Sequence, residues 1–266
     1  MIDPAKVCLF QPSELKRFKQ ELFERIGNKI KAQGGRVIVG NVSQLKSLPK
    51  DIIPIVGCST YLKGTVDEWR AKKRQFIYWD RGYWARVFAT WLPRGDNGGQ
   101  YRWHLNSFQL QQVRADLPND RLKVLRPPVR DWSGKGRHIV LAQPTPSYAK
   151  FHGIEGWTDS TLDALSLLTD RQIVVRGKES KRPLQADLDG AHCLVAHGSN
   201  AAVESVICGC PVLVDPSSAA ALVGRTDLKD IERPVYPDRE AWLRALSYSH
   251  FNEAELLNGT LWKLLG

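Results

Sequence analysis

Residues Ala191 to Asp215 constrain the fold more than any other stretch of this chain, because they predict a complete strand–turn–helix–strand unit. Cys193–Ala196 is a short apolar run suited to a buried parallel strand, and His197–Asn200 is a polar turn. Ala201–Cys208 has apolar residues at helical spacing and is followed by a glycine and a proline, which favour a helix end. Pro211–Val214 predicts a second buried strand. The stretch therefore predicts a βαβ unit and an α/β fold.

The polar turn of this unit is suited to binding a phosphate. The first amides of a helix are unpaired donors, and the helix dipole adds partial positive charge there. Gly198 allows close approach to the backbone, and Ser199 and Asn200 can cap the helix or hydrogen-bond a phosphate. His197 ends the strand, where open α/β sheets bind ligands, and Glu204 could reach a sugar hydroxyl. The alternative is a capped helix that binds nothing.

The turn, Glu204, Gly209 and Pro211–Leu213 together resemble the donor-site signature of GT-B glycosyltransferases. In that family a His or Ser-Gly turn holds the pyrophosphate of a nucleotide-sugar, and a Glu on the next helix takes the ribose hydroxyls. The resemblance covers mainly residues 136–266. It implies a GT-B-like α/β fold, with two Rossmann-type domains facing each other across a cleft. It also implies a hexosyltransferase that uses a UDP- or GDP-sugar and requires no metal or other cofactor.

The stretch from Pro127 to Gly136 predicts an interdomain linker, because it combines two prolines, two glycines and several charges. We therefore expect a basic N-terminal acceptor domain over 1–130 and a Rossmann-like donor domain with C-terminal helices over 136–266. Gln143–Ser147 is a turn placed to meet a ligand from the other side of the donor site.

Other candidate donor residues follow predicted strands of the second domain. Arg176 and Lys178 end the strand Arg171–Arg176, where cations suit a diphosphate, and Ser217 begins another helix. Asp187-Leu188-Asp189 matches the metal motif of the GT-A glycosyltransferases, but we expect a surface turn there and no metal site. The expected donor-binding residues are Arg176, Lys178, His197, Gly198, Ser199, Asn200, Glu204 and Ser217.

The net positive charge of the chain comes entirely from its first half. Residues 1–133 contain 24 Lys and Arg against 12 Asp and Glu, whereas residues 134–266 contain 14 against 16. A field this one-sided attracts a polyanion. Residues 69–103 interleave aromatics with cations, a mixture suited to a splayed strand or a flipped base, unless the aromatics form the core. The candidate acceptor-binding residues are Arg70, Lys72, Lys73, Arg74, Arg81, Tyr83, Trp84, Arg86, Arg94 and Arg102.

The candidate catalytic residue is Asp80, at the end of the predicted strand Gln75–Asp80. A carboxylate there faces the ligand crevice and could deprotonate an acceptor hydroxyl. It could equally be the salt-bridge partner of Arg81 or Arg86.

These features favour a glycosyltransferase whose acceptor is double-stranded DNA, most simply a hydroxymethylated pyrimidine in bacteriophage DNA. The alternatives are a glycosyltransferase of cell-surface glycan or polysaccharide synthesis and a non-enzymatic nucleic-acid-binding module on a degenerate GT-B fold. No apolar run reaches the ~20 residues of a membrane helix, the N-terminus has no signal architecture, and the five cysteines are scattered. We therefore expect a cytoplasmic protein, in the host cell if it is phage-encoded.

Overall fold

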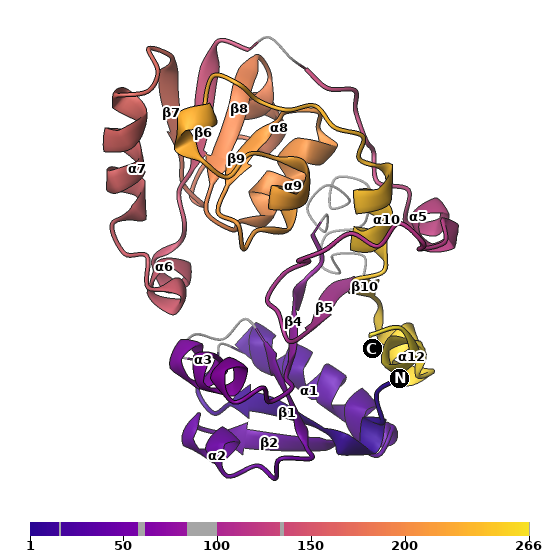
Figure 1. The fold of residues 1–266 in the computed structure, drawn as a ribbon. Helices are drawn as coiled ribbons and strands as arrows, with labels where there is room; N and C mark the ends of the chain where they lie inside the picture. The colour runs from indigo at the N-terminus through magenta and orange to yellow at the C-terminus, as the bar shows by residue number, and fades with distance from the viewer. Residues whose placement is uncertain (16, 58–61, 84–99, 134–135, 266) are drawn as a thin grey trace. The chain divides into compact units, whose positions relative to one another are not determined.

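The computed structural model describes residues 1–15, 17–57, 62–83, 100–133 and 136–265 (Figure 1). These residues form two compact units. Unit 1 comprises the described residues 1–83, 100–108 and 248–265, and unit 2 comprises 109–247 with its gap. Both units are α/β, and parallel strands dominate both sheets. No helix among the described residues is long and apolar enough to cross a membrane.

Unit 1 is built on a six-stranded sheet in the order β10-β5-β4-β3-β1-β2. Its strands are β1 (Val7–Pro12), β2 (Arg36–Gly40), β3 (Ile53–Gly57), β4 (Ile77–Arg81), β5 (Tyr101–Leu105) and β10 (His250–Phe251). Its helices are η1 (Pro4–Lys6), α1 (Arg17–Ala32), α2 (Ser43–Lys46), α3 (Lys63–Ala71), α11 (Glu253–Leu257) and α12 (Thr260–Leu264). Strands β1, β2, β3 and β4 run parallel to one another. Strand β5 is antiparallel to β4, and β10 is antiparallel to β5.

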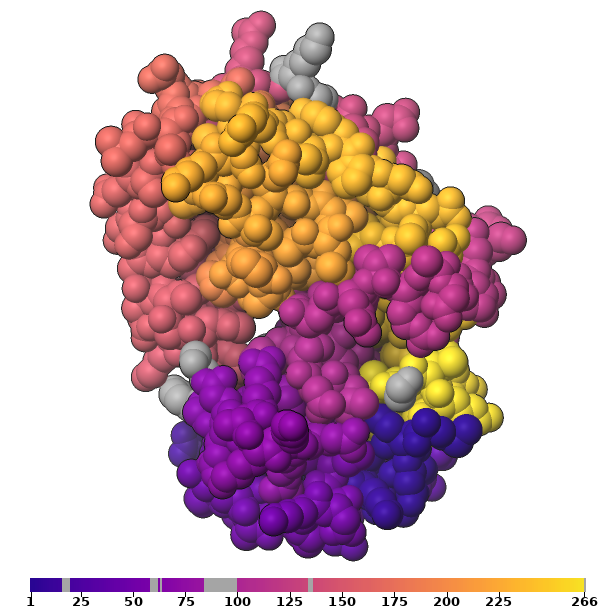
Figure 2. Space-filling model, viewed as in Figure 1, coloured from indigo at the N-terminus to yellow at the C-terminus, as the bar shows by residue number. Residues whose placement is uncertain are grey.

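The C-terminal tail belongs to the core of unit 1. Phe251, Leu256 and Trp262 pack in one apolar cluster with Ile26 and Trp103. The amide of Ile2 also donates to the carbonyl of Trp262 (2.9 Å), so the two termini lie close together (Figures 1 and 2). Burying these large side chains places residues 248–265 in unit 1, although the sequence suggested a donor domain that continues to residue 266.

The other boundary also differs from the expected one, because the chain enters unit 2 at Gln109. The expected linker, Pro127–Gly136, packs within unit 2 where it is described. The amides of Arg130 and Ser133 donate to the carbonyls of Ile207 and Gly209. Proline and glycine suit a surface segment hydrogen-bonded to a helix end as well as they suit a linker, so composition did not distinguish the two.

Unit 2 contains a four-stranded, fully parallel sheet in the order β7-β6-β8-β9. Its strands are β6 (His138–Ala142), β7 (Gln172–Arg176), β8 (Ala191–Ala196) and β9 (Val212–Val214). Its helices are α5 (Asp120–Leu125), α6 (Pro146–His152), α7 (Trp157–Ser166), α8 (Leu184–Leu188), α9 (Asn200–Ile207), η3 (Ala219–Val223), η4 (Leu228–Asp230) and α10 (Glu240–Ser247). The βαβ unit expected between residues 191 and 215 is present as β8, α9 and β9.

The strand order of unit 2 fixes where a ligand crevice can form. Alternate residues of β6 and β8, including Leu141 and Val195, pack with Leu165 of α7, while Val140 and Leu194 are buried on the other face. From β6 the chain proceeds to β7 on one side and later to β8 on the other. Such a reversal opens a crevice at the carboxyl ends of the two central strands. In unit 2 that point lies between β6 and β8.

Candidate functional site

The carboxyl ends of three strands in unit 2 each lead to a helix start capped by a hydroxyl. Thr145 caps α6 after β6, Ser199 caps α9 after β8, and Ser218 caps η3 after β9. The parallel sheet brings these helix starts to one edge. Partial positive charge therefore accumulates at the edge where the fold is expected to bind ligands.

The turn between β8 and α9 has its carbonyls bonded and two of its amides open. The carbonyl of His197 accepts from the amide of Asp215 (3.2 Å), that of Gly198 from Nε2 of Gln109 (2.5 Å), and that of Ser199 from the amide of Ala202 (3.0 Å). The N–H groups of Gly198 and Ser199 have no partner among the residues that the structure describes. A backbone segment with satisfied acceptors and open donors is suited to binding an anion.

His197 is held between two side chains beside this turn. Its Nδ1 lies 3.3 Å from the hydroxyl of Tyr148, and its Nε2 lies 3.7 Å from Oδ2 of Asp215. Burial lowers the pKa of His197 below its ordinary value, and the Asp215 carboxylate partly offsets this effect. The neutral imidazole can accept at Nδ1 from the Tyr148 hydroxyl, in the tautomer that carries its proton on Nε2. Near neutral pH, His197 is therefore a hydrogen-bonding group rather than a cation.

We expect His197 to titrate below an ordinary histidine in an NMR pH titration, and the substitution D215N to lower its pKa further. Asparagine keeps an oxygen for the neighbouring Ser217 while removing the charge that favours the imidazolium. The unfolded chain binds this proton more readily, so His197 reduces stability as the pH falls below about 6.5. A His197 signal that titrates at or above the ordinary value in the wild-type protein would contradict this assignment.

Aromatic rings surround His197 at the switch point between β6 and β8. The His197 ring centroid lies 5.9 Å from Tyr148, 5.7 Å from His152 and 6.2 Å from Trp157. These residues come from α6 and α7, which follow β6 in the chain. Tyr148, His152 and Trp157 are all partly exposed, so their rings form an accessible aromatic surface beside the open amides of the turn.

The two cations expected at the end of β7 differ in their environments. Arg176 forms an ion pair with Asp187 and also donates to the hydroxyl of Ser180 (3.1 Å) and the carbonyl of Arg182 (2.6 Å). Its charge is thus already matched within unit 2. Asp187 is buried on α8, so the expectation of a surface turn there was wrong. Lys178 is exposed and has no partner among the described residues, which leaves its charge open to a ligand.

The remaining expected donor residues are not equally accessible. The Ser199 hydroxyl accepts from the amide of Ala201 (3.1 Å), and Asn200 is the first residue of α9. Ser217 is exposed, and its amide and hydroxyl both donate to Asp215. Glu204 is only 3% exposed, so a ribose does not reach its carboxylate in this conformation.

The site also contains residues that the sequence did not single out. Asp215 directly follows the predicted strand Pro211–Val214, and Tyr148 directly follows the predicted turn Gln143–Ser147. Gln109 gave no signal, because it is separated from Gly198 by 89 positions in the chain.

In unit 1, Asp80 is the next-to-last residue of β4 and forms an ion pair with the buried Arg102 (Oδ2 to Nη2, 2.9 Å). The hydroxyl of Tyr78 also donates to this carboxylate (3.2 Å). A salt bridge was one of the alternatives for Asp80, and its ion-pair partner among the described residues is Arg102 and not Arg81, while Arg86 lies outside them. Because 21% of the Asp80 side chain remains exposed, the carboxylate can still meet solvent.

Two of the residues expected to contact nucleic acid are buried in unit 1. The amide of Tyr83 donates to Nε2 of His250 (2.7 Å), and its hydroxyl lies 2.8 Å from Nε2 of His104. Burial, together with the nearby charge of Arg102, lowers the pKa of His104 well below its ordinary value. Tyr83 and Arg102 are therefore not available to a nucleic acid in this structure. Phe76 and Trp103, in the same aromatic-rich segment, belong to the buried core, which agrees with the alternative that its aromatics form the core.

The other candidate acceptor cations differ in whether their side chains already contact other groups of the protein. Lys72 pairs with Glu68 (2.7 Å), and Arg70 lies over the ring of Phe108 (4.7 Å). Arg74 donates to backbone carbonyls, whereas Lys73 and Arg81 are exposed. Trp84, Arg86 and Arg94 lie outside the described residues.

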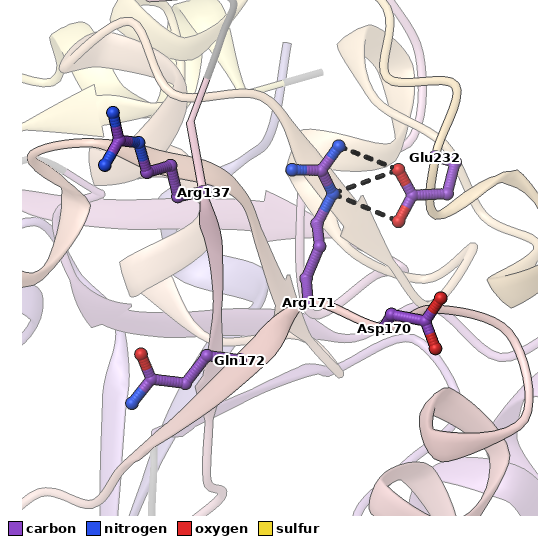
Figure 3. A pocket seen from close by; sticks show the side chains of 5 residues that line it. All are labelled: Arg137, Asp170, Arg171, Gln172 and Glu232. Atoms are coloured by element: carbon purple, nitrogen blue, oxygen red, sulfur yellow. Dashed lines mark hydrogen bonds and ion pairs between the residues drawn. The ribbon is translucent and has the colours of Figure 1, made fainter.

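A polar pocket of about 490 Å³ lies at the opposite edge of the unit 2 sheet (Figure 3). Arg137, Asp170, Arg171, Gln172 and Glu232 line it. It is at the amino ends of β6 and β7, which begin at His138 and Gln172. Arg171 and Glu232 are paired with each other (2.9 Å), so their charges are mutually satisfied. The pocket is therefore separate from the carboxyl edge and from the open amides.

No model of a known protein family matches the sequence, and no curated protein matches it. Among solved structures, the chain is similar to KpsC of Thermosulfurimonas dismutans, a beta Kdo 2,7 transferase. The TM-score is 0.53 and the identity 12%, and the similarity covers 96% of this chain and 99% of that one. At this identity the similarity shows the fold alone. The chain thus has an α/β fold similar to that of this transferase along nearly its whole length.

Proposed function

We propose that this chain is a glycosyltransferase that moves a sugar from a nucleotide-sugar donor to an acceptor of cell-surface polysaccharide synthesis. The observation that carries the proposal is the turn after β8. Its carbonyls are bonded, its Gly198 and Ser199 amides are open, and it lies at the switch point of a parallel sheet. The fold similarity to a beta Kdo transferase supports glycosyl transfer and this class of acceptor.

In the proposed reaction, unit 2 binds the donor and stabilises its leaving phosphate. Glycosyl transfer passes through an oxocarbenium-like state while negative charge grows on the leaving group. Fixed N–H groups aimed at that charge stabilise the transition state. Gly198, Ser199 and the start of α9 supply these donors, Lys178 supplies a positive charge, and neutral His197 supplies a hydrogen bond.

Unit 1 is the proposed acceptor-binding part, in a GT-B arrangement with unit 2. The acceptor hydroxyl must lose a proton, and Asp80 at the end of β4 is the proposed base. Residues 1–108 contain 19 Lys and Arg against 9 Asp and Glu, and this basic surplus suits an anionic acceptor, such as an acidic glycan or a phosphate-linked sugar.

A DNA acceptor, with transfer to a hydroxymethylated pyrimidine, is the second candidate, and the same basic surplus favours it. However, base flipping needs exposed stacking surfaces, and Tyr83, Phe76 and Trp103 are buried. We therefore rank a glycan acceptor above DNA. Tight DNA binding without sugar transfer would instead indicate a non-enzymatic nucleic-acid-binding module.

The test is calorimetric titration of the protein with uridine, guanosine and cytidine nucleotides and their sugar conjugates, including nucleotide-activated Kdo. We expect one nucleotide series to bind, and the matching conjugate to compete with the free nucleotide. If no member binds at millimolar concentration, the proposed function is lost. Binding to duplex DNA at ~50 mM salt and to anionic lipid vesicles is then measured in parallel. DNA binding would favour the DNA acceptor, and vesicle binding without DNA binding would favour the cell-surface acceptor.

A further inference from the structure

Two successive residues anchor the chain where it passes from unit 1 to unit 2. Phe108 packs within unit 1, with its ring 5.0 Å from that of Tyr78 and beneath the guanidinium of Arg70 (4.7 Å). Gln109 is 5% exposed and bonds within unit 2. Phe108 is therefore anchored in unit 1 and the next residue, Gln109, in unit 2.

The carboxamide of Gln109 bridges the two turns that form the candidate donor site. Its Nε2 donates to the carbonyl of Gly198 (2.5 Å), after β8, and its Oε1 accepts from the amide of Ala219 (2.9 Å), after β9. Gln111 adds one weaker restraint, because its Nε2 donates to the carbonyl of the exposed Ser217 (3.0 Å). Gln109 thus links both turns through one buried side chain.

The bond to Gly198 also fixes the direction of a neighbouring amide. The C=O of Gly198 and the N–H of Ser199 belong to one planar trans peptide, so they point in opposite directions. While Gln109 holds the carbonyl, the Ser199 amide is directed away from Gln109. This is one of the two amides left without a partner among the described residues.

We propose that Gln109 is a positioning residue that holds the Gly198–Ser199 peptide in the orientation that presents the Ser199 amide to the donor phosphate. This inference rests on the proposed function of the turn. Without the side-chain donor, the peptide can rotate and direct the Gly198 carbonyl towards the phosphate, where its partial negative charge repels the anion. The crossing segment would then determine whether the donor site is formed.

The substitution Q109E tests the proposal because glutamate has nearly the same shape. Its carboxylate can still accept from the Ala219 amide, but it cannot donate to the Gly198 carbonyl. We expect nucleotide affinity to fall by about 10- to 100-fold at pH 8 and to recover partly as the pH is lowered, because a protonated carboxyl group can donate again. The wild-type protein, measured at the same pH values, corrects for the titration of other groups.

The matched control is Q112E, which adds the same charge three residues away on an exposed side chain. We expect its affinity to change by less than about threefold. A Q109E variant that binds nucleotide as tightly as the wild type overturns the inference. A crystal structure of Q109E in which the Gly198–Ser199 peptide keeps its wild-type orientation would also overturn the inference. This measurement needs no ligand. Absence of nucleotide binding in the wild type would overturn the proposed function instead.

Discussion

Replacing Gly198 by alanine is expected to weaken nucleotide binding strongly while leaving the protein folded. A Cβ atom at this position would lie 2.4 Å from the hydroxyl of Tyr148 and 2.9 Å from Nε2 of Gln109. Neither atom can move freely, because the hydroxyl bonds to His197 and Gln109 is buried and bonded twice. Overpacking of this kind costs about 1–3 kcal/mol, and the displaced groups are those that shape the phosphate site. We expect affinity to fall by about 100-fold.

The control for this prediction is G177A, at a second glycine on the carboxyl edge of the same sheet. Its added Cβ would meet nothing closer than Oε1 of Gln143, at 3.4 Å, so we expect normal binding. In the double variant G198A/Y148F the hydroxyl is gone and only the contact with Gln109 remains, so part of the affinity should return. Titration calorimetry with thermal unfolding separates loss of binding from loss of fold. G198A binding at wild-type strength would show that no phosphate approaches this turn.

The central βαβ unit was predictable from the sequence because every signal in it is local. Apolar runs mark β8 and β9, helical spacing marks α9, and Gly209 and Pro211 end the helix. The open amides follow from the same local features, since a helix start always leaves donors unpaired.

The partners of the site were not predictable, because they come from distant parts of the chain. Gln109 reaches Gly198 only after the sheet has formed, and Tyr148 reaches His197 because β6 and β8 are neighbours. Arg176 has the residue type and the position expected of a phosphate ligand, but Asp187 matches its charge from a helix farther along the chain. Position at a strand end therefore predicts where a side chain lies, and its partner determines whether it is available.

The described part of the aromatic-rich segment illustrates the opposite case, in which composition left a surface and a core both open and the fold places these residues in the core. Stacking on bases and packing in a core require the same residue types. Trp79 stacks on Trp103 at 5.6 Å inside unit 1, and the C-terminal tail adds Trp262 to the same cluster. The tail lies more than 150 positions away in the sequence, so nothing local indicated that this cluster would be covered.

Removing the carboxylate of Asp80 is expected to destabilise unit 1 by about 3–5 kcal/mol, because Arg102 would be left as a buried charge without its partner. Burial alone would lower the pKa of Arg102, but Asp80 and the neighbouring tyrosines raise it above its ordinary value, so the guanidinium stays charged. Urea unfolding of D80A should show this loss. The control D67A breaks an exposed pair, Asp67 with Arg70 at 4.0 Å, and should cost less than about 1 kcal/mol.

The same experiment separates a structural role of Asp80 from a catalytic one. In the double variant D80N/R102M both charges are absent, and we expect much of the lost stability to return, because removing a whole buried pair costs less than removing half of it. If Asp80 is the base that deprotonates the acceptor, D80N/R102M is stable but inactive in sugar transfer. Its nucleotide affinity stays normal, because the donor residues lie in unit 2. If transfer activity returns together with stability, Asp80 serves only to neutralise Arg102, and the base must be sought elsewhere. A D80A variant as stable as the wild type would contradict the account of the ion pair itself.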